Sequence, residues 1–307
     1  MKFTDYNSPE KAVINKSFKT IPYMDMWISS IIEGYIYEKV DKVDDKGYRE
    51  EYTERYGELE GELKIWYSTN GQLYSQRYYK EGKKEGEHKE WWDNGLLKYQ
   101  CYYKEGKYEG ECKGWYDNRQ LARQCYYKEG KYEGECKEWC YNGQLWNQCY
   151  YKEGKEEGEN KWWNSDGQLE RQCYFKEGKK DGENKEWYKN GQLERQCYYK
   201  EGKYEGEYKQ WYHNGQLSSQ YYYKEGEVEG EHKEWRHNGK LWSQSYYKEG
   251  KLEGEYKQWY HNGQLRRQMY YKDGKREGEN KSWDKEGNLT EHKIYTGDEV
   301  IKDFLKI

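Results

Sequence analysis

A pattern of glycine, charged and aromatic positions with a period of 24 residues runs along most of the chain. It is clear in residues 182–205, GENKEWYKNGQLERQCYYKEGKYE, and it keeps its register without insertion from Gly86 to Tyr295. An earlier copy, residues 61–85, has one extra residue before its turn, so that ten units can be counted. A fixed period of this length indicates a repeat architecture in which each unit packs against its neighbours.

Each unit is predicted to be a β-hairpin. Segments rich in Tyr and Trp, which suit a pleated sheet, flank an Asn-Gly pair such as Asn94-Gly95. Asn-Gly favours the positive φ values of a two-residue type I′ turn. A second glycine-containing turn, from Lys224 to Glu227 in one unit, leads into the next hairpin.

A two-residue turn at Asn-Gly predicts the strand register by arithmetic. The pairs expected within one hairpin are Trp91 with Lys98, Lys89 with Gln100, and Glu87 with Tyr102. The pairs expected across the second turn are Tyr102 with Glu111 and Gln100 with Lys113. The same register predicts tryptophan pairs, Trp139 with Trp146 and Trp235 with Trp242.

Both faces of the predicted sheet carry aromatic residues. One face receives Glu, Lys, Trp, Gln and Tyr from every unit, and the other receives Leu and the second Tyr of each pair, such as Tyr103, Tyr127 and Tyr151. Neither face is apolar enough to require a second layer. The expected fold is all-β, an elongated single-layer antiparallel sheet of about ten tandem β-hairpin repeats. With about 4.8 Å between strands, it would span on the order of 100 Å.

The two ends of the chain depart from the repeat. Residues 1–56 are expected to be an N-terminal cap or docking segment, with a short amphipathic helix within residues 21–36 and a loop or degenerate repeat after it. The repeat array is expected over residues 57–295. Residues 296–307 concentrate aliphatic side chains and are expected to be a C-terminal cap that blocks edge pairing.

Composition narrows the possible functions. The net charge is −4, with 15 Trp and 39 Tyr, so we expect a folded protein without a thick aliphatic core. Lysine and glutamate are interleaved, and no basic stripe indicates nucleic acid. No apolar run is long enough for a membrane span, and the first residues do not resemble a signal peptide. We therefore expect a cytoplasmic protein that is not secreted.

The repeat resembles a known family. The pattern GKxEGExKxWYxNGQLxxQxYYKEGK is similar to the MORN repeat, in the longer variant found in many bacterial proteins and in large DNA viruses that infect amoebae. The resemblance covers about residues 57–295. It implies a hairpin array that acts as a scaffold for protein contacts, and for some members an association with membrane lipids or the cytoskeleton. Some bacterial members are labelled antitoxins.

The eight cysteines suggest a disulfide or metal site. Cys101, Cys125, Cys149, Cys173 and Cys197 share one repeat phase, about 10 Å apart from unit to unit, which is too far for a disulfide between them. In the expected register Cys101 could face Cys112, and Cys125 could face Cys136. The positions opposite the later three are Asn160, Asn184 and Tyr208, so free thiols are the preferred interpretation. No Cys-x-x-Cys zinc pattern occurs, and His213, His237 and His261 are too far apart to share one metal.

An enzyme is not expected, since the repeated glutamates do not form an asymmetric, desolvated site. No cofactor or metal is predicted. The exposed aromatic rows and the positions that vary between units are the candidate partner-binding residues. They are Trp115, Trp139, Trp146, Trp187, Trp211, Trp235, Trp242, Trp259, Arg123, Arg171, Arg195 and Arg267, and Glu170 is a further variable position. The predicted function is a non-enzymatic scaffold with a protein partner. A module that binds membrane or lipid surfaces and an antitoxin or immunity protein are the alternatives.

Overall fold

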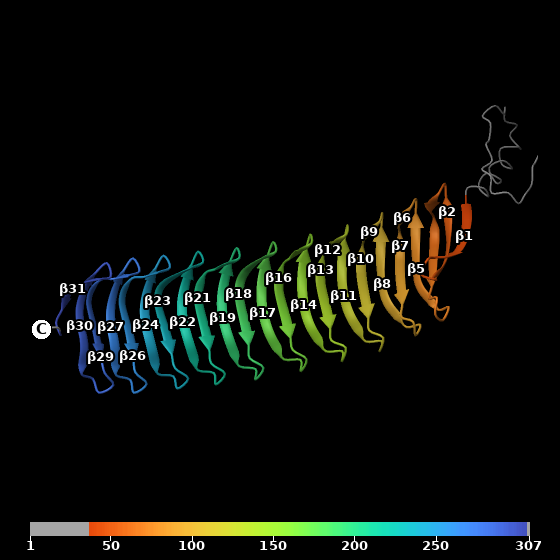
Figure 1. Cartoon of the computed structure of the whole chain (residues 1–307). Coiled ribbons are helices and arrows are strands. Elements are labelled where there is room, and N and C mark those ends of the chain that lie inside the picture. The colour runs from red at the N-terminus through yellow and green to blue at the C-terminus, as the bar shows by residue number, and fades with distance from the viewer. Residues whose placement is uncertain (1–36, 306–307) are drawn as a thin grey trace, which may run out of the picture.

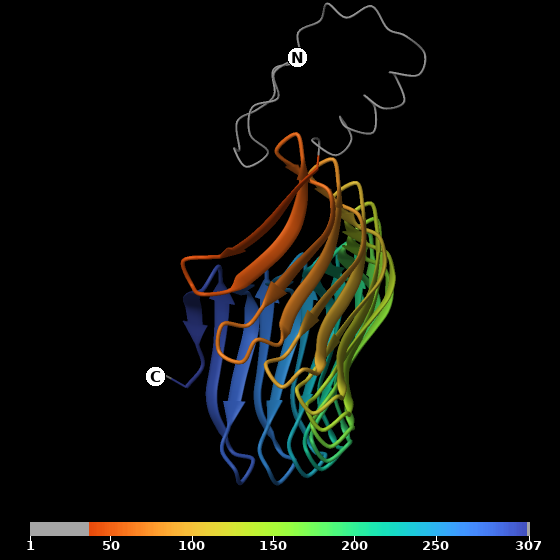
Figure 2. The ribbon, with the colours of Figure 1, turned by 90° about the vertical axis from the view of Figure 1, so that its right-hand side faces the viewer.

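Residues 37–305 are described by a computed structural model, and they form one antiparallel sheet of 31 strands without a helix. Figure 1 shows the strands side by side in chain order, from the N-terminal end to the C-terminal end of a long single layer. The end view in Figure 2 shows that this layer is curved. The predicted all-β array of hairpins is confirmed. The helix expected within residues 21–36 lies outside the described residues.

Each unit contributes two main strands. The first begins at the repeat glycine and ends at the repeat tryptophan: β4 (Gly61–Trp66), β7 (Gly86–Trp91), β10 (Gly110–Trp115), β13 (Gly134–Trp139), β16 (Gly158–Trp163), β21 (Gly206–Trp211), β26 (Gly254–Trp259) and β29 (Gly278–Trp283). The second begins at the repeat leucine: β5 (Leu73–Lys80), β8 (Leu97–Lys104), β11 (Leu121–Lys128), β14 (Leu145–Lys152), β17 (Leu169–Lys176), β19 (Leu193–Lys200), β22 (Leu217–Lys224), β24 (Leu241–Lys248), β27 (Leu265–Lys272) and β30 (Leu289–Thr296).

A two-residue strand precedes most of the glycine strands and is separated from them by a bulge. These short strands are β3 (Glu58–Leu59), β6 (Lys83–Lys84), β9 (Lys107–Tyr108), β12 (Lys131–Tyr132), β15 (Lys155–Glu156), β20 (Lys203–Tyr204), β25 (Lys251–Leu252) and β28 (Lys275–Arg276). In two units the short and long strands are continuous, as β18 (Lys179–Trp187) and β23 (Glu227–Trp235).

The Asn-Gly turn is not the two-residue type I′ turn that the sequence predicts. The backbone N–H of Gly95 donates to the carbonyl of Trp92 at 2.9 Å, and the N–H of Trp92 donates to the carbonyl of Leu96 at 2.8 Å. Only the glycine of this pair has a positive φ, of 79°. The loop therefore has three residues, in which a turn is followed by a left-handed glycine that forms a bulge.

This extra residue changes the register at the end of each hairpin. Lys89 faces Gln100 and Glu87 faces Tyr102, as predicted, but Trp91 faces Leu97 instead of Lys98. The predicted tryptophan pairs are wrong for the same reason, because Trp139 faces Leu145. Trp235 likewise faces Leu241.

The type I′ conformation occurs at the other turn. Glu105 and Gly106 have φ values of 50° and 80° between the paired residues Lys104 and Lys107. After this turn the N–H of Glu109 donates to the carbonyl of Tyr102 at 2.9 Å, so the predicted pairing of Tyr102 with Glu111 is wrong. A bulge at Gly110, whose φ is 77°, then restores the predicted pair of Gln100 with Lys113. Glycine recurs at this position because side chains rarely tolerate such a φ.

The sheet begins earlier than expected. Strands β1 (Tyr37–Val43) and β2 (Arg49–Arg55) form a hairpin that pairs with β4, so ordered strand pairing starts at Tyr37 and not near Tyr56. Asp44 stabilises its turn by accepting hydrogen bonds from the N–H groups of Lys46 and Tyr48 at 2.9 and 2.8 Å. Residues 37–55 are therefore a β-hairpin and not a loop, and their interpretation as a degenerate repeat stays a prediction.

The C-terminal segment adds one more strand, β31 (Glu299–Asp303), which pairs with β30. Its apolar side chains are not buried, since Val300 is 49% and Ile301 63% exposed. Phe304 stacks on the His292 ring at 4.1 Å. The segment therefore extends the sheet and presents apolar side chains at its last edge.

Candidate functional site

One face of the sheet carries the same polar network in nearly every unit. In one unit Glu87 accepts hydrogen bonds from Gln100 at 2.5 Å and from the Tyr102 hydroxyl at 3.1 Å through one carboxylate oxygen. Its other oxygen accepts from Lys89 at 2.5 Å. We call this the glutamate face, defined by the repeat positions of Glu87, Lys89, Gln100 and Tyr102. Strand alternation fixes these four side chains on one side of the sheet.

The exposed aromatic residues of the glutamate face are the first tyrosines of the Tyr-Tyr pairs. Their exposed fractions lie between 37% and 48%. They are Tyr78, Tyr102, Tyr126, Tyr150, Tyr198, Tyr222, Tyr246 and Tyr270. The sequence-based candidates did not include them. The signal was present, since the first tyrosine recurs two residues after the repeat glutamine and therefore on the same face.

The opposite face holds the small hydrophobic core. Cys101, Cys112, Cys125, Cys136 and Cys149 are at most 5% exposed and lie in one row across neighbouring strands. We call this row, with the second tyrosine of each pair, the cysteine face. The tyrosines form a continuous ladder beside the row, with ring centroids 4.5 Å apart from Tyr103 to Tyr108 and 4.9 Å from Tyr108 to Tyr127. The aromatic ladder predicted for this face is confirmed.

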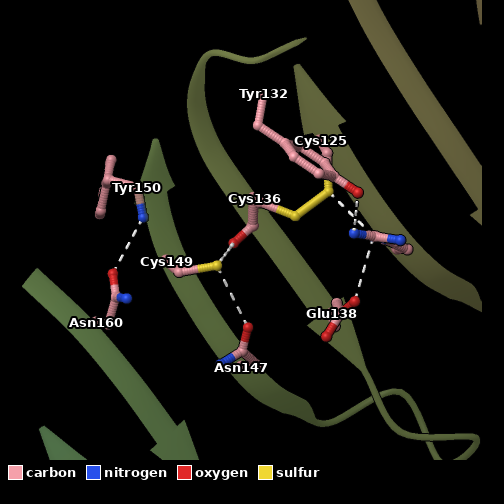
Figure 3. Close-up of a disulfide and its surroundings, with 9 residues drawn as sticks. Cys125, Tyr132, Cys136, Glu138, Asn147, Cys149, Tyr150 and Asn160 are labelled. Atoms are coloured by element: carbon pink, nitrogen blue, oxygen red, sulfur yellow. Dashed lines mark hydrogen bonds and ion pairs between the residues drawn. A yellow bond between two sulfur atoms is a disulfide. The ribbon is translucent and has the colours of Figure 1, made fainter. Parts of the chain in front are cut away.

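Cys125 and Cys136 are joined by a disulfide across adjacent strands, with their Cα atoms 4.1 Å apart (Figure 3). The expectation of free thiols is therefore wrong for this pair, although the predicted juxtaposition of the two residues is correct. The other six cysteines are free. Cys173 faces Asn184, as the register predicts.

The structure does not bring the predicted binding residues onto one surface. The repeat tryptophans alternate with Glu and Lys and therefore belong to the glutamate face: Trp115, Trp139, Trp187, Trp211, Trp235 and Trp259, all half-buried. Trp146 and Trp242 occupy a bulge, where the register shifts between the tryptophan strand and the leucine strand, so alternation does not place them on the glutamate face. Trp242 packs on the cysteine face, with its ring centre 4.6 Å from the Arg236 guanidinium. Trp146, at the equivalent position, is 39% exposed and is the one exposed tryptophan among these candidates.

The four candidate arginines belong to the cysteine face, since they alternate with Cys125, Cys173, Cys197 and Met269. Arg123 donates to the Tyr132 hydroxyl at 2.7 Å and contacts Glu138 at 3.2 Å. Arg171 lies 4.1 Å from the ring centre of Trp162, and Arg195 pairs with Glu186. Arg267 lines a shallow hollow near the C-terminal end. Three of the four are thus engaged within the sheet.

Comparison with known families agrees with this architecture. The profile described as MORN repeat variant matches residues 59–81, 84–105, 156–177, 180–201, 204–225, 228–249 and 252–273, which together are more than half of the chain. The chain belongs to the MORN repeat variant family. The matches leave out residues 106–155, although these residues form the same strands and turns as the matched MORN units.

Other comparisons add little. No curated protein matches this MORN repeat chain. Among solved structures, a crystal structure of TarM is similar with 15% identity and a TM-score of 0.22, over 46% of this chain and 24% of that one. A mutant of S. aureus TarM in complex with fondaparinux, alpha-GlcNAc-glycerol and UDP has 11% identity and a TM-score of 0.18, over 54% of this chain and 24% of that one. The chain thus spans about a quarter of their length.

Side chains connect each MORN unit to the next at both edges of the sheet. At the Asn-Gly edge the Tyr116 hydroxyl donates to the carbonyl of Trp139 at 2.7 Å, and the Asn118 side chain donates to the carbonyl of Tyr141 at 2.9 Å. At the other edge the Glu109 carboxylate accepts from the N–H of Glu129 at 2.9 Å. The side chains of these tyrosine, asparagine and glutamate positions therefore have a structural role in the MORN array.

The glutamate network makes stability depend on pH. The carboxyl pKa values of Glu87, Glu231 and Glu255 are lowered, chiefly because the lysine two residues later donates a hydrogen bond to each carboxylate. A carboxyl group whose pKa is lower in the folded state than in the unfolded state stabilises the fold when the pH is above the unfolded pKa of about 4.3. This stability is lost as the pH falls through the pKa of the folded state.

We therefore expect the unfolding temperature to fall when pH is lowered from 7 to 3, in thermal melts followed by circular dichroism. Each largely exposed unit contributes only about 0.3 kcal/mol, but the network recurs along the rod. High salt should reduce the pH dependence, because it screens exposed ion pairs. An unfolding temperature that is constant from pH 7 to pH 3 would show that the network does not stabilise the fold.

The part of the chain that the structure describes, residues 37–305, contains no group of three or more His, Cys, Asp or Glu side chains placed to hold a metal ion. It also contains no helix that is long and apolar enough to cross a membrane.

Proposed function

We propose that this MORN repeat chain is a protein-interaction scaffold that binds its partner through the glutamate face. The observation that carries the proposal is the row of half-exposed tyrosines at a constant interval of two strands, about 10 Å. Tyrosine and tryptophan are enriched at protein interfaces because they provide large contact areas with few rotatable bonds.

The tyrosines of this row are oriented before any partner binds. The hydroxyl groups of Tyr126 and Tyr150 donate to Glu111 and Glu135 at 2.9 and 2.8 Å. A side chain that is already fixed loses less conformational entropy on binding. The row therefore provides a preorganised surface with exposed aromatic rings and an interleaved pattern of positive and negative charge.

The interface does not include the position two residues before the repeat glutamine, which varies from Ala122 to Trp146, Glu170 and Trp242. A bulge at this position turns its side chain to the cysteine face, where Trp242 packs on Arg236. We place the centre of the interface at Tyr126 and Tyr150, which are exposed and are oriented by their hydrogen bonds to the glutamates.

The test begins with affinity purification of the full chain to identify the partner, followed by binding measurements with the purified partner. The double variant Tyr126→Ser and Tyr150→Ser should weaken binding by at least about tenfold, since interface aromatic residues each contribute about 1–2 kcal/mol. Arg267→Ser is the matched control, because it removes an exposed side chain from the cysteine face. It should leave the affinity unchanged.

A second arm separates the rod from the N-terminal segment. A chain that lacks residues 1–36 retains every described strand and should retain the partner. A partner that is lost with residues 1–36 but still binds the double variant would overturn the proposal, since the repeats would then be only a spacer.

A further inference from the structure

The row of cysteines contains a second pair that occupies the same geometry as the disulfide. A shift of one 24-residue unit relates Cys101 to Cys125 and Cys112 to Cys136. The strand register is identical, because Gln100 faces Lys113 in one unit and Gln124 faces Lys137 in the next. Cys101 and Cys112 are therefore opposite each other in the way that Cys125 and Cys136 are.

The surroundings of the two pairs also correspond. Tyr103 and Tyr108 pack beside the first pair with ring centres 4.5 Å apart. Tyr127 and Tyr132 pack beside the second pair at the same distance of 4.5 Å. Because backbone register and flanking rings agree, a side-chain geometry that permits a disulfide in the second pair also permits it in the first.

The first pair has free thiols that contact each other. Cys101 is fully buried and Cys112 is 4% exposed. The pKa of Cys112 is lowered, chiefly because the Cys101 thiol hydrogen-bonds to its sulfur. A thiol that ionises more readily at the contact is the one that initiates exchange with a disulfide, since the thiolate is the nucleophile.

No other cysteine in the row has a cysteine opposite it at an equivalent position. Asn160 occupies that position for Cys149, Asn184 for Cys173 and Tyr208 for Cys197. Within the hairpins Cys112 also faces Cys125, and Cys136 faces Cys149. Between units, facing cysteines are limited to two successive interfaces, Cys101 with Cys112 (β8 with β10) and Cys125 with Cys136 (β11 with β13). All but Cys101 of these four residues lie in residues 106–155, the segment outside the family matches.

We propose that Cys101 and Cys112 form a second cross-strand disulfide site, so that the cysteine face undergoes two separate dithiol–disulfide reactions with small disulfides of the glutathione class. In each, one cysteine thiolate attacks the small disulfide, forms a mixed disulfide and releases one thiolate. The second cysteine then attacks the mixed disulfide, forms the cross-strand bond and releases the other. Two protein thiols are oxidised while one small disulfide is reduced to two thiols.

The two sites differ in the charge next to the sulfur, so they should be reduced at different potentials. The Arg123 guanidinium lies 3.2 Å from the sulfur of Cys125, and the equivalent residue beside Cys101 is Tyr99. A cation stabilises a thiolate and with it the reduced form, which favours reduction of the adjacent disulfide. The Cys125–Cys136 disulfide is therefore expected to be reduced in less reducing glutathione buffer than the Cys101–Cys112 disulfide.

The test uses the full chain, equilibrated in oxidised and reduced glutathione buffers from both starting states, because buried thiols exchange only when the sheet opens locally. After acid quenching, the chain is unfolded, alkylated and analysed by mass spectrometry. The chain has eight cysteines, six of them free in the structure, so one disulfide leaves six alkylated residues. The proposal requires a species with four alkylated residues, in which peptide mapping locates Cys101–Cys112.

The decisive variant is Cys125→Ser with Cys136→Ser, which leaves Cys101 and Cys112 as the one facing pair among the described strands. It should still form one disulfide in oxidising buffer, while Cys101→Ser in the otherwise unchanged chain should form only Cys125–Cys136. Cys173→Ser is the control and should not alter either disulfide. Complete alkylation of Cys101 and Cys112 in every buffer, in the chain and in a folded double variant, would overturn the proposal.

Discussion

Replacing Asn160 by aspartate is expected to lower the free energy of unfolding by about 3 kcal/mol at pH 7. Asn160 is fully buried in the cysteine face (Figure 3). Its carbonyl oxygen accepts from the N–H of Tyr150 at 3.2 Å, and its amide donates to the Glu156 carboxylate at 2.9 Å. Aspartate has the same shape but no donor, so a buried carboxylate would face a second carboxylate.

The effect of Asn160→Asp should depend on pH. Burial already raises the pKa of Glu156, and a second carboxylate at this distance raises both values further. A carboxyl group whose pKa is higher in the folded state than in the unfolded state destabilises the fold when the pH is above these values. This loss of unfolding free energy disappears as the pH falls and one of the two groups takes up a proton. The free energy of unfolding of Asn160→Asp should therefore be close to that of the unchanged chain near pH 4 and lower by the full amount at pH 7. Chemical denaturation at both pH values measures this difference.

Asn280→Asp is a matched control for this experiment. Asn280 is buried at the equivalent position five units later, and it accepts from the N–H of Tyr270 at 3.1 Å. The residue that corresponds to Glu156 is Arg276, so the new carboxylate would meet a cation. Asn280→Asp should cost clearly less than Asn160→Asp. Equal losses for the two variants would show that burial of the charge alone, and not the glutamate, determines the cost.

The sequence was sufficient to predict the sheet but not its turns. A strict period of two strands per unit, with tyrosine and tryptophan in alternation, leaves few alternatives to a hairpin array. The choice between two- and three-residue loops at Asn94-Gly95 depends on one backbone φ, which the residue types do not determine. That difference of one residue moves Trp91 from Lys98 to Leu97 and removes the expected tryptophan pairs.

For the candidate site, the sequence could predict only the face of the sheet on which most side chains lie, because this follows from strand alternation. Alternation places Arg123 on the cysteine face and the first tyrosines beside the glutamates. It fails at Trp146, because the bulge at this position turns the side chain away from the glutamate face. The exposure of each aromatic ring could not be predicted, because it depends on how neighbouring side chains cover the ring. Tyr102 is 42% exposed, whereas Tyr103, the next residue, is 7% exposed in the aromatic ladder.

The second large effect is expected from deletions that keep or break the repeat period. Removal of residues 173–196 joins Gln172 to Cys197 and restores the strand sequence LERQCYYK. Because each unit contacts only its neighbours, this 24-residue deletion should leave the unfolding temperature within a few degrees. It should shorten the rod by about 10 Å, the width of two strands, in small-angle X-ray scattering.

Removal of residues 173–195, which is one residue less, leaves an extra glutamine in the middle of the same strand. A shift of one residue turns every later side chain of that strand to the other face, so Gln196 would take the buried place of a cysteine. The free energy of unfolding should fall by more than about 3 kcal/mol, because a polar side chain is buried and the tyrosine ladder is broken. The two deletions differ by a single residue, so their comparison isolates register from length. Indistinguishable denaturation curves for the two chains would mean that the strand absorbs the extra residue in a bulge, and that alternation of the two faces is not what stabilises the MORN array.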